Sequence, residues 1–518
     1  MMLKRNMFAA VPMLTVIILS LFACGSSDEK EGGAGSSVPS NLSANILFRD
    51  EVELTWTAST DSKSVTGYKQ YRDGTFVSQV PGPSAVDAGL SANTVYSFRV
   101  TALNAGGNES APSTSLPVRT LRYSTYLSTT GLNVARAVAM DTLGNVYITG
   151  TTEGKLGENL ANNLGGLDVF VAKFNFFQEL QWVVQYGTSF DDIGEAIAVN
   201  GNNVYLAGQT RGVIGTQPGA ALQGGTDAFV MHLDARDGSV LGDIVQFGTP
   251  QDDGIAAATV SGGSLIVAGS TKGSLYATNE GLSDIIVARF ASTLATPPVW
   301  GRQIGSSGND QARAVAVDSG GNIFVAGSFS NQNVYVTRFD SAGDQGTTWV
   351  TNSGQTGEAT GIAVDDAGSN VFVAGTTPSS FLGNSLGDND IFVMKLNASL
   401  PSAPNVVWST QLGSTGNDQA VAVTLKSATE VLVAGTTGGN FYATNRGGID
   451  FFTTAVDAAS GSTLSGWGQQ YGTTADDAVF GLAYDRGRNA GFLSGYIKRG
   501  STASDATIWH FDQNGILQ

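Results

Sequence analysis

A single glycine recurs at a nearly constant interval along most of this chain and constrains its fold more than any other feature. Each copy ends a short apolar run, and the seven copies are Gly150, Gly208, Gly269, Gly327, Gly375, Gly435 and Gly495. The spacings are 58, 61, 58, 48, 60 and 60 residues. Such a period is typical of architectures in which one small unit cannot bury its apolar faces alone and stacks on its neighbours. The sequence therefore predicts seven stacked units.

Each unit contains four short hydrophobic runs. In the second unit they span residues 182–187, 195–199, 204–208 and 227–233, with Gly/Asn turns between them. Runs this short, rich in Val, Ile, Phe and Tyr, indicate strands joined as antiparallel meanders. Four strands repeated seven times predict an all-β fold, a seven-bladed β-propeller of four-stranded blades over residues 121–518.

The two ends of the repeat array predict how the ring closes. Residues 123–128 match the run at 182–187, which is the fourth and outermost strand of a blade, but no third strand precedes them. The last copy stops after residues 508–511, which form a third strand. We therefore expect the N-terminal strand to complete the last blade, which removes an edge open to aggregation.

The recurring segments D-x-F-V-x-K-F, Q-Y-G-T/S, A-V-A-V-D and N-V-Y-V-A-G-T-T resemble the bacterial SBBP-type β-propeller repeat family over residues 123–518. This resemblance implies an architecture. It carries no shared enzymatic activity that could be assigned to individual residues.

Residues 39–120 show a different pattern, with two-residue alternation at 52–56, 67–71 and 94–100. Such alternation predicts half-buried strands of a small sandwich. Through Leu54-Thr55-Trp56, Tyr71-Arg72-Asp73-Gly74 and Tyr96 the segment resembles a fibronectin type III domain. The resemblance implies a core role for Trp56 and a corner-binding hydroxyl on Tyr96. We expect this domain to serve as a spacer.

The N-terminus has the features of an export signal. Lys4 and Arg5 precede an apolar run from Met7 to Phe22, and a lone cysteine, Cys24, follows. The run is too short for a typical membrane-spanning helix. Leu21 to Gly25 resembles the lipobox of bacterial lipoproteins, which implies a signal peptide at 1–23, acylation of Cys24 and anchoring in the outer membrane. Residues 24–38 are rich in Gly and Ser and predict a flexible tether.

Charge limits the classes of partner. The chain carries a formal net charge of -17, and a field of this sign repels nucleic acid and anionic headgroups. We expect a monomer that binds the membrane through its lipid and takes a protein or glycan ligand.

Paired acidic residues recur five positions after the glycine that ends the fourth strand, and they are the only candidates for a metal site. Calcium takes six to eight oxygen ligands, but the complete EF-hand pattern is absent. The alternative is that Asp and Asn side chains shape the turns by accepting backbone N–H bonds. The calcium candidates are Asp191, Asp192, Asp252, Asp253, Asp310, Asp418, Asp476 and Asp477.

Residue types that recur in every unit are expected to be structural. His232 and His510 occupy a position that is basic in other units, for example Lys173. Trp182 and the tryptophans at the equivalent position of other units predict packing between neighbouring blades. Aspartates open the third strand in six units and predict turn or inter-blade contacts. The fourth unit is the shortest and has Gly357-Glu358 in place of the acidic pair. Its shortening is either a simple deletion or a gap in the loops that admits a ligand to the centre of the ring.

No H-E-x-x-H, Walker loop or Cys/His cluster is present, and we expect no catalytic residues and no cofactor other than the calcium considered above. The sequence thus predicts a non-enzymatic, lipid-anchored envelope protein with a binding propeller. The alternatives are a carbohydrate-active hydrolase or lyase that uses the paired carboxylates, and a purely structural or adhesive surface component.

Overall fold

The computed structural model describes residues 36–46, 48–60, 64–122, 124–157, 163–294, 297–330, 333–350, 356–378, 385–398, 406–499 and 503–518. Within these ranges every regular element is a β-strand, and no segment forms a helix that could cross a membrane. Cys24, most of the predicted tether and Tyr123 lie outside the described residues.

The N-terminal domain is a sandwich of two antiparallel sheets, in the orders β1-β2-β5 and β4-β3-β6-β7. Its strands are β1 (Ser40–Asn45), β2 (Glu51–Thr57), β3 (Val65–Arg72), β4 (Thr75–Val80), β5 (Ser84–Ala88), β6 (Val95–Asn104) and β7 (Leu116–Arg119). Trp56 is buried in the core with its ring 5.3 Å from that of Tyr68. The hydroxyl of Tyr96 accepts a hydrogen bond from the Ser91 N–H at 2.9 Å. Both aromatic roles predicted from the sequence are confirmed.

The rest of the chain forms seven four-stranded antiparallel sheets, numbered 1 to 7 in chain order. Their first strands are β9 (Asn133–Met140), β13 (Asp192–Asn200), β17 (Asp253–Ser261), β21 (Gln311–Val317), β25 (Glu358–Val364), β29 (Asp418–Leu425) and β33 (Asp477–Asp485). The second strands are β10 (Val146–Thr152), β14 (Asn203–Thr210), β18 (Ser264–Thr271), β22 (Ile323–Phe329), β26 (Asn370–Thr377), β30 (Glu430–Thr437) and β34 (Ala490–Arg499).

The outer half of each sheet is built the same way. The third strands are β11 (Asp168–Phe174), β15 (Asp227–Asp234), β19 (Asp284–Phe290), β23 (Asn333–Phe339), β27 (Asp390–Asn397), β31 (Asp450–Asp457) and β35 (Ala503–Phe511). The fourth strands are β12 (Leu180–Tyr186), β16 (Val245–Phe247), β20 (Trp300–Ile304), β24 (Gln345–Val350), β28 (Val406–Leu412), β32 (Gln469–Tyr471) and, in sheet 7, β8 (Thr125–Leu127).

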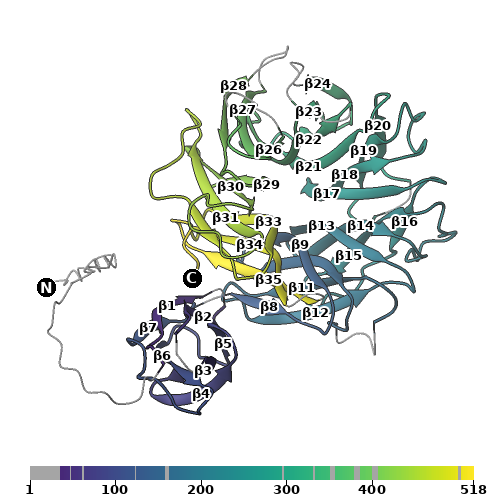
Figure 1. Cartoon of the computed structure of the whole chain (residues 1–518). Coiled ribbons are helices and arrows are strands. Elements are labelled where there is room, and N and C mark those ends of the chain that lie inside the picture. Colours follow the sequence, from purple (N-terminus) through teal and green to yellow (C-terminus); the bar gives the residue numbers. More distant parts are fainter. Residues whose placement is uncertain are drawn as a thin grey trace, which may run out of the picture.

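The seven sheets are arranged around a common centre (Figure 1). Each first strand contacts the next, from β9 through β13, β17, β21, β25 and β29 to β33, and β33 contacts β9. Strand β8 pairs with β35, with Leu127 opposite Ala506 and Thr125 opposite Ile508. The sequence places this strand beside residues 508–511, and the paired residues lie slightly earlier in the same strand.

The hydrophobic core lies between neighbouring sheets. Seven separate clusters of buried side chains each join two adjacent sheets, and one of them joins sheet 7 to sheet 1. Because the second and third strands are covered on both faces, their residues are buried almost without interruption, as in β10 and β15. This explains why the sequence shows continuous apolar runs there rather than alternation.

Outer-strand tryptophans reach across to the next sheet, as their shared slot predicts. The indole N–H groups of Trp182, Trp300 and Trp408 donate to Ala235, Ser341 and Ala458 carbonyls, each at 3.2 Å. The basic slot on the third strand supplies a second donor to the same three carbonyls, from Lys173, Arg289 and Lys395. At each of these three interfaces one carbonyl thus receives two donors from the preceding sheet.

Candidate functional site

Each of the seven first strands contains a β-bulge at the same position. The pairing of first and second strands skips one residue of the first strand in every sheet. A bulge leaves its extra residue unpaired and redirects the side chain. The skipped residues, which we call the bulge ring, are Arg136, Glu195, Ala256, Arg313, Thr360, Val421 and Phe480.

The bulge accounts for the repeated glycine. A Cβ on Gly150 would lie 1.8 Å from the carbonyl oxygen of Val134 on the bulged strand, and one on Gly495 would lie 1.9 Å from that of Ala478. A Cβ on each of the other five glycines would lie 1.9 to 2.1 Å from the equivalent carbonyl oxygen of its own bulged strand. Only glycine allows the two backbones to approach this closely. The residue that marks each repeat therefore makes room for the bulge.

All seven bulge-ring residues line one cavity of about 560 Å³ at the centre of the sheets, called here the central cavity. Their chemistry divides the ring into two arcs. Sheets 1, 2 and 4 contribute charged side chains, whereas sheets 6 and 7 contribute Val421 and Phe480. The central cavity is therefore charged along one arc and apolar along another.

Two ion pairs dominate the charged arc. Arg136 donates to Glu195 at 3.4 Å. Arg313 donates to Glu358 at 2.5 Å and to the side-chain oxygen of Gln311 at 2.7 Å. Burial raises the pKa of Glu195, and the neighbouring Arg136 and Arg313 offset part of that rise. Positive and negative charges therefore balance within this arc.

The apolar arc meets the charged arc at Arg136. The guanidinium of Arg136 lies over the ring of Phe480, 6.0 Å from its centroid. Phe480 also neighbours Tyr496, with ring centroids 5.9 Å apart. Glu358, the residue that departs from the acidic pair in the shortened unit, also lines the central cavity.

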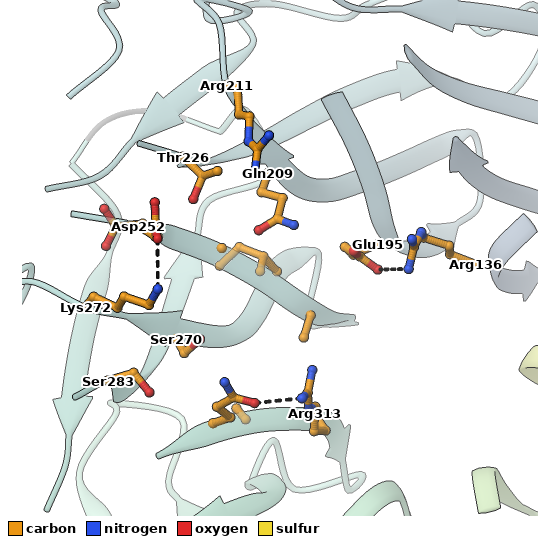
Figure 2. Close-up of a pocket in the computed structure, with 16 residues that line it drawn as sticks. Arg136, Glu195, Gln209, Arg211, Thr226, Asp252, Ser270, Lys272, Ser283 and Arg313 are labelled. Atoms are coloured by element: carbon orange, nitrogen blue, oxygen red, sulfur yellow. Dashed lines mark hydrogen bonds and ion pairs between the residues drawn. The ribbon is translucent and has the colours of Figure 1, made fainter. Parts of the chain in front are cut away.

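A second pocket of about 430 Å³, the mouth pocket, shares Arg136, Glu195, Ala256 and Arg313 with the central cavity. Figure 2 shows polar side chains of sheets 1 to 4 around it. The lining adds the hydrogen-bonding side chains of Gln209, Arg211, Thr226, Ser270, Lys272, Ser283 and Gln311. Most residues that line this pocket are polar or charged.

The predicted acidic pairs divide into two classes. Three first members reach basic side chains at or just after the ends of the second strands, Asp191 to Arg211 at 3.3 Å, Asp252 to Lys272 at 2.9 Å and Asp476 to Lys498 at 2.8 Å. The hydrogen bond from Lys272 lowers the pKa of Asp252. These pairs are exposed in large part, and such contacts stabilise a fold by little.

The second members are buried inside the turns that enter the first strands. Each accepts the backbone N–H and the hydroxyl of a Thr or Ser four residues earlier, and the residues are Asp192, Asp253, Asp310, Asp418 and Asp477. Burial raises the pKa values of Asp192, Asp253 and Asp477, the last to about 7.

These contacts match the turn-shaping alternative. Among the described residues no three Asp, Glu, His or Cys side chains gather as a metal ion would require. The calcium hypothesis stays a prediction.

The aspartates that open the third strands anchor the loops before them. In five sheets a glutamine of the fourth strand donates to this carboxylate at 2.7 to 2.9 Å: Gln185 to Asp168, Gln246 to Asp227, Gln303 to Asp284, Gln411 to Asp390 and Gln470 to Asp450. In sheet 6 the oxygen of Gln470 accepts three loop N–H groups, from Phe441, Tyr442 and Ala443. These carboxylates are structural.

Both histidines lie away from the two cavities. His232 stacks on Tyr205 at 4.7 Å and contacts Asn203, while His510 stacks on Phe492 at 4.7 Å. Burial lowers both pKa values, that of His510 to about 4. They occupy the repeated third-strand slot predicted from the sequence.

Sequence reasoning missed the bulge ring. Its signal is a column of unlike residues, Arg, Glu, Ala, Arg, Thr, Val and Phe, at one position of seven otherwise similar strands. Alignment of the seven units would have revealed it.

Comparisons with known proteins identify both parts of the chain. The fibronectin type III domain model matches residues 37–119, and the beta-propeller repeat model (SBBP) matches residues 122–158 and 299–328. The chain is similar to exoglucanase B of Cellulomonas fimi, with 37% identity over 26% of this chain and 12% of the relative. Chitinase D of Niallia circulans is 49% identical over 15% of each chain.

These likenesses are local. The chain covers at most 19% of the length of the first three curated relatives, and the shared part is the fibronectin-like region. The crystal structure of FN3tt matches 17% of this chain and 98% of its own, with 19% identity and a TM-score of 0.15. The two family-model matches show that the chain contains a fibronectin type III domain followed by SBBP beta-propeller repeats.

Proposed function

We propose that this protein is a non-enzymatic binding protein whose ligand, a protein or a glycan, enters the mouth pocket and central cavity. One observation carries this proposal. The bulge ring varies from sheet to sheet, while the strands, glycines and loop anchors that hold it are nearly uniform. A uniform scaffold that directs unlike side chains into one cavity is what a binding site requires.

The scaffold in this proposal is a seven-bladed propeller over residues 121–518, with β8 as the outer strand of the last blade. The repeated sheet order, the contact of β33 with β9 and the pairing of β8 with β35 support it. Cysteines at the facing positions Tyr126 and Thr507, in a Cys24→Ser background, test it. We expect a disulfide that joins the two ends of the array and changes mobility on non-reducing gels. Free thiols under oxidation would contradict this closure.

The proposed location is the bacterial cell envelope, where residues 1–23 are removed and the acylated Cys24 anchors the protein in the outer membrane. It rests on the sequence of the leader. Two acyl chains on Cys24 would hold the protein on a membrane without a spanning helix. Mass spectrometry of the mature N-terminus tests it, with Cys24→Ser as the control. An unmodified or uncleaved terminus would contradict it.

Glycan arrays and pull-down from envelope extracts test the binding function. We expect a ligand whose capture is lost when Ala256, which lines both cavities, is replaced by the much larger tryptophan. Turnover of a carbohydrate panel would favour the hydrolase or lyase alternative instead. Absence of any ligand from both assays would favour a purely structural component.

A further inference from the structure

We propose that the ligand is an uncharged, hydroxyl-rich saccharide, whose hydroxyl edge faces the charged arc of the bulge ring and whose C–H face lies against Phe480. This inference rests on the proposed binding function and names its ligand class.

The balance of charge in the two cavities favours an uncharged ligand. The chain as a whole carries -17, yet each cation of the two cavities has an acidic neighbour. Arg136 pairs with Glu195, Arg211 with Asp191, Lys272 with Asp252 and Arg313 with Glu358. An anionic ligand would have to displace these carboxylates, and a cationic ligand would have to displace the basic groups. An uncharged ligand leaves both in place.

Hydrogen-bond donors and acceptors alternate along the charged arc, as a ligand rich in hydroxyl groups requires. A sugar hydroxyl donates one hydrogen bond and accepts others, so neighbouring hydroxyls need donors and acceptors side by side. Gln311, Arg313 and Glu358 form one such row, linked at 2.7 and 2.5 Å. Arg136 and Glu195 form another, in which the contact of 3.4 Å is long enough for a hydroxyl to compete.

The apolar arc offers an aromatic surface for the C–H groups of a sugar. Phe480 and Val421 belong to adjacent sheets and line the central cavity together. An aromatic ring offers a flat, polarizable face, against which the C–H groups of a pyranose can pack without the loss of any hydroxyl contact. Cavities of about 430 and 560 Å³ suit one or a few sugar rings.

Isothermal titration of the purified protein tests this ligand class. The probes are neutral oligosaccharides built from glucose, N-acetylglucosamine, galactose or mannose, with oligogalacturonate and chitosan oligomers as the charged counterparts. We expect one neutral series to bind, with a Kd that changes less than twofold between 50 and 500 mM NaCl. Preference for a charged series, with a Kd that rises steeply with salt, would overturn the inference.

Variants locate the site. We expect Phe480→Ala and Arg313→Gln each to weaken neutral-sugar binding at least tenfold, and Ala256→Trp to abolish it without removing an ion pair. Arg236→Gln is the matched control, because Arg236 is exposed and pairs only locally with Asp234. Full sugar affinity in Ala256→Trp, with a native melting curve, would overturn the inference.

The outcome separates the inference from the function on which it rests. If no sugar binds but pull-down yields a protein whose capture Ala256→Trp abolishes, the saccharide inference fails and the binding function stands. If neither assay yields a ligand, both fail.

Discussion

The guanidinium of Arg499 donates to both carboxylate oxygens of Glu51, at 3.0 and 3.2 Å, and so joins the end of β34 to the fibronectin type III domain. The same guanidinium reaches Asp505 at 2.8 Å. Phe48, in the loop between β1 and β2, is buried in the cluster between sheets 6 and 7 and packs on Tyr126 of β8, with ring centroids 4.8 Å apart. The domain thus docks where the first and last strands of the array meet.

Phe48→Ala is expected to destabilise this docking. Truncation of a buried phenylalanine costs about 3–5 kcal/mol in a protein core. Because Phe48 contacts β8, we expect the melting temperature of the repeat array to fall and proteolysis between the two parts to accelerate. Phe76→Ala is the control, since Phe76 is 52% exposed on the same domain. Equal melting curves for the two variants would show that the docking contributes nothing to the array.

Gly461→Ala is expected to loosen the interface between sheets 5 and 6. Gly461 has a φ of +75°, and an added Cβ would lie 2.5 Å from the ring of Trp408. The left-handed conformation costs about 1–2 kcal/mol for a non-glycine residue, and overpacking adds about 1–3 kcal/mol. Gly466→Ala measures the first contribution alone, because Gly466 has a φ of +86° and open space around it, so the difference between the two variants gives the second. Chemical denaturation should show the larger loss for Gly461→Ala, and equal losses would refute the tryptophan contact.

The sequence was sufficient for the parts of this fold that repeat. Period, strand count and the slots of Trp182 and Lys173 are all visible as columns of similar residues. The bulge was not visible, because a run such as Ala135-Arg136-Ala137 reads as ordinary strand alternation. The repeated glycine signalled a close backbone approach without revealing which strand approaches it.

Docking of the fibronectin domain was equally hidden. It depends on Phe48, one apolar residue in a short loop, and on an ion pair between residues 448 positions apart. Neither forms a periodic pattern. The acidic pairs show the same limit, since only the structure separates the exposed Asp252 from the buried Asp253.

Gln470→Ala is expected to release the loop before β31. The side chain of Gln470 donates to the buried Asp450 at 2.9 Å and accepts three loop N–H groups. Loss of a hydrogen bond to a buried charged group costs about 1.5–3 kcal/mol. Hydrogen exchange should show faster exchange of the Phe441 and Tyr442 amides. Gln469→Ala, on the same strand, should leave these amides protected, and unchanged protection in Gln470→Ala would contradict the anchoring role.

Asp477→Asn is expected to remove a pH dependence of stability. Burial, with smaller contributions from Asp450 and from Glu53 of the fibronectin domain, raises the pKa of Asp477 to about 7 from a usual 3.8. Between these values the folded protein holds a proton that the unfolded chain releases. The stabilisation is therefore complete below about pH 4 and is lost as pH rises towards 7, by at most about 1.4 kcal/mol per pH unit.

The measurement is the free energy of unfolding from urea titrations at several pH values, as the difference between wild type and variant, so that other groups such as His510 cancel. The asparagine keeps a side-chain oxygen that can accept the hydrogen bond from the Thr473 N–H, so the turn is preserved. We expect wild type to lose stability relative to Asp477→Asn from pH 4 to 7 and to run parallel to it above. Asp476→Asn is the matched control, because Asp476 lies at the surface against Lys498. Parallel curves for wild type and Asp477→Asn across the whole range would mean that this carboxyl is already ionised in the folded protein at pH 4, and that its turn tolerates a buried charge.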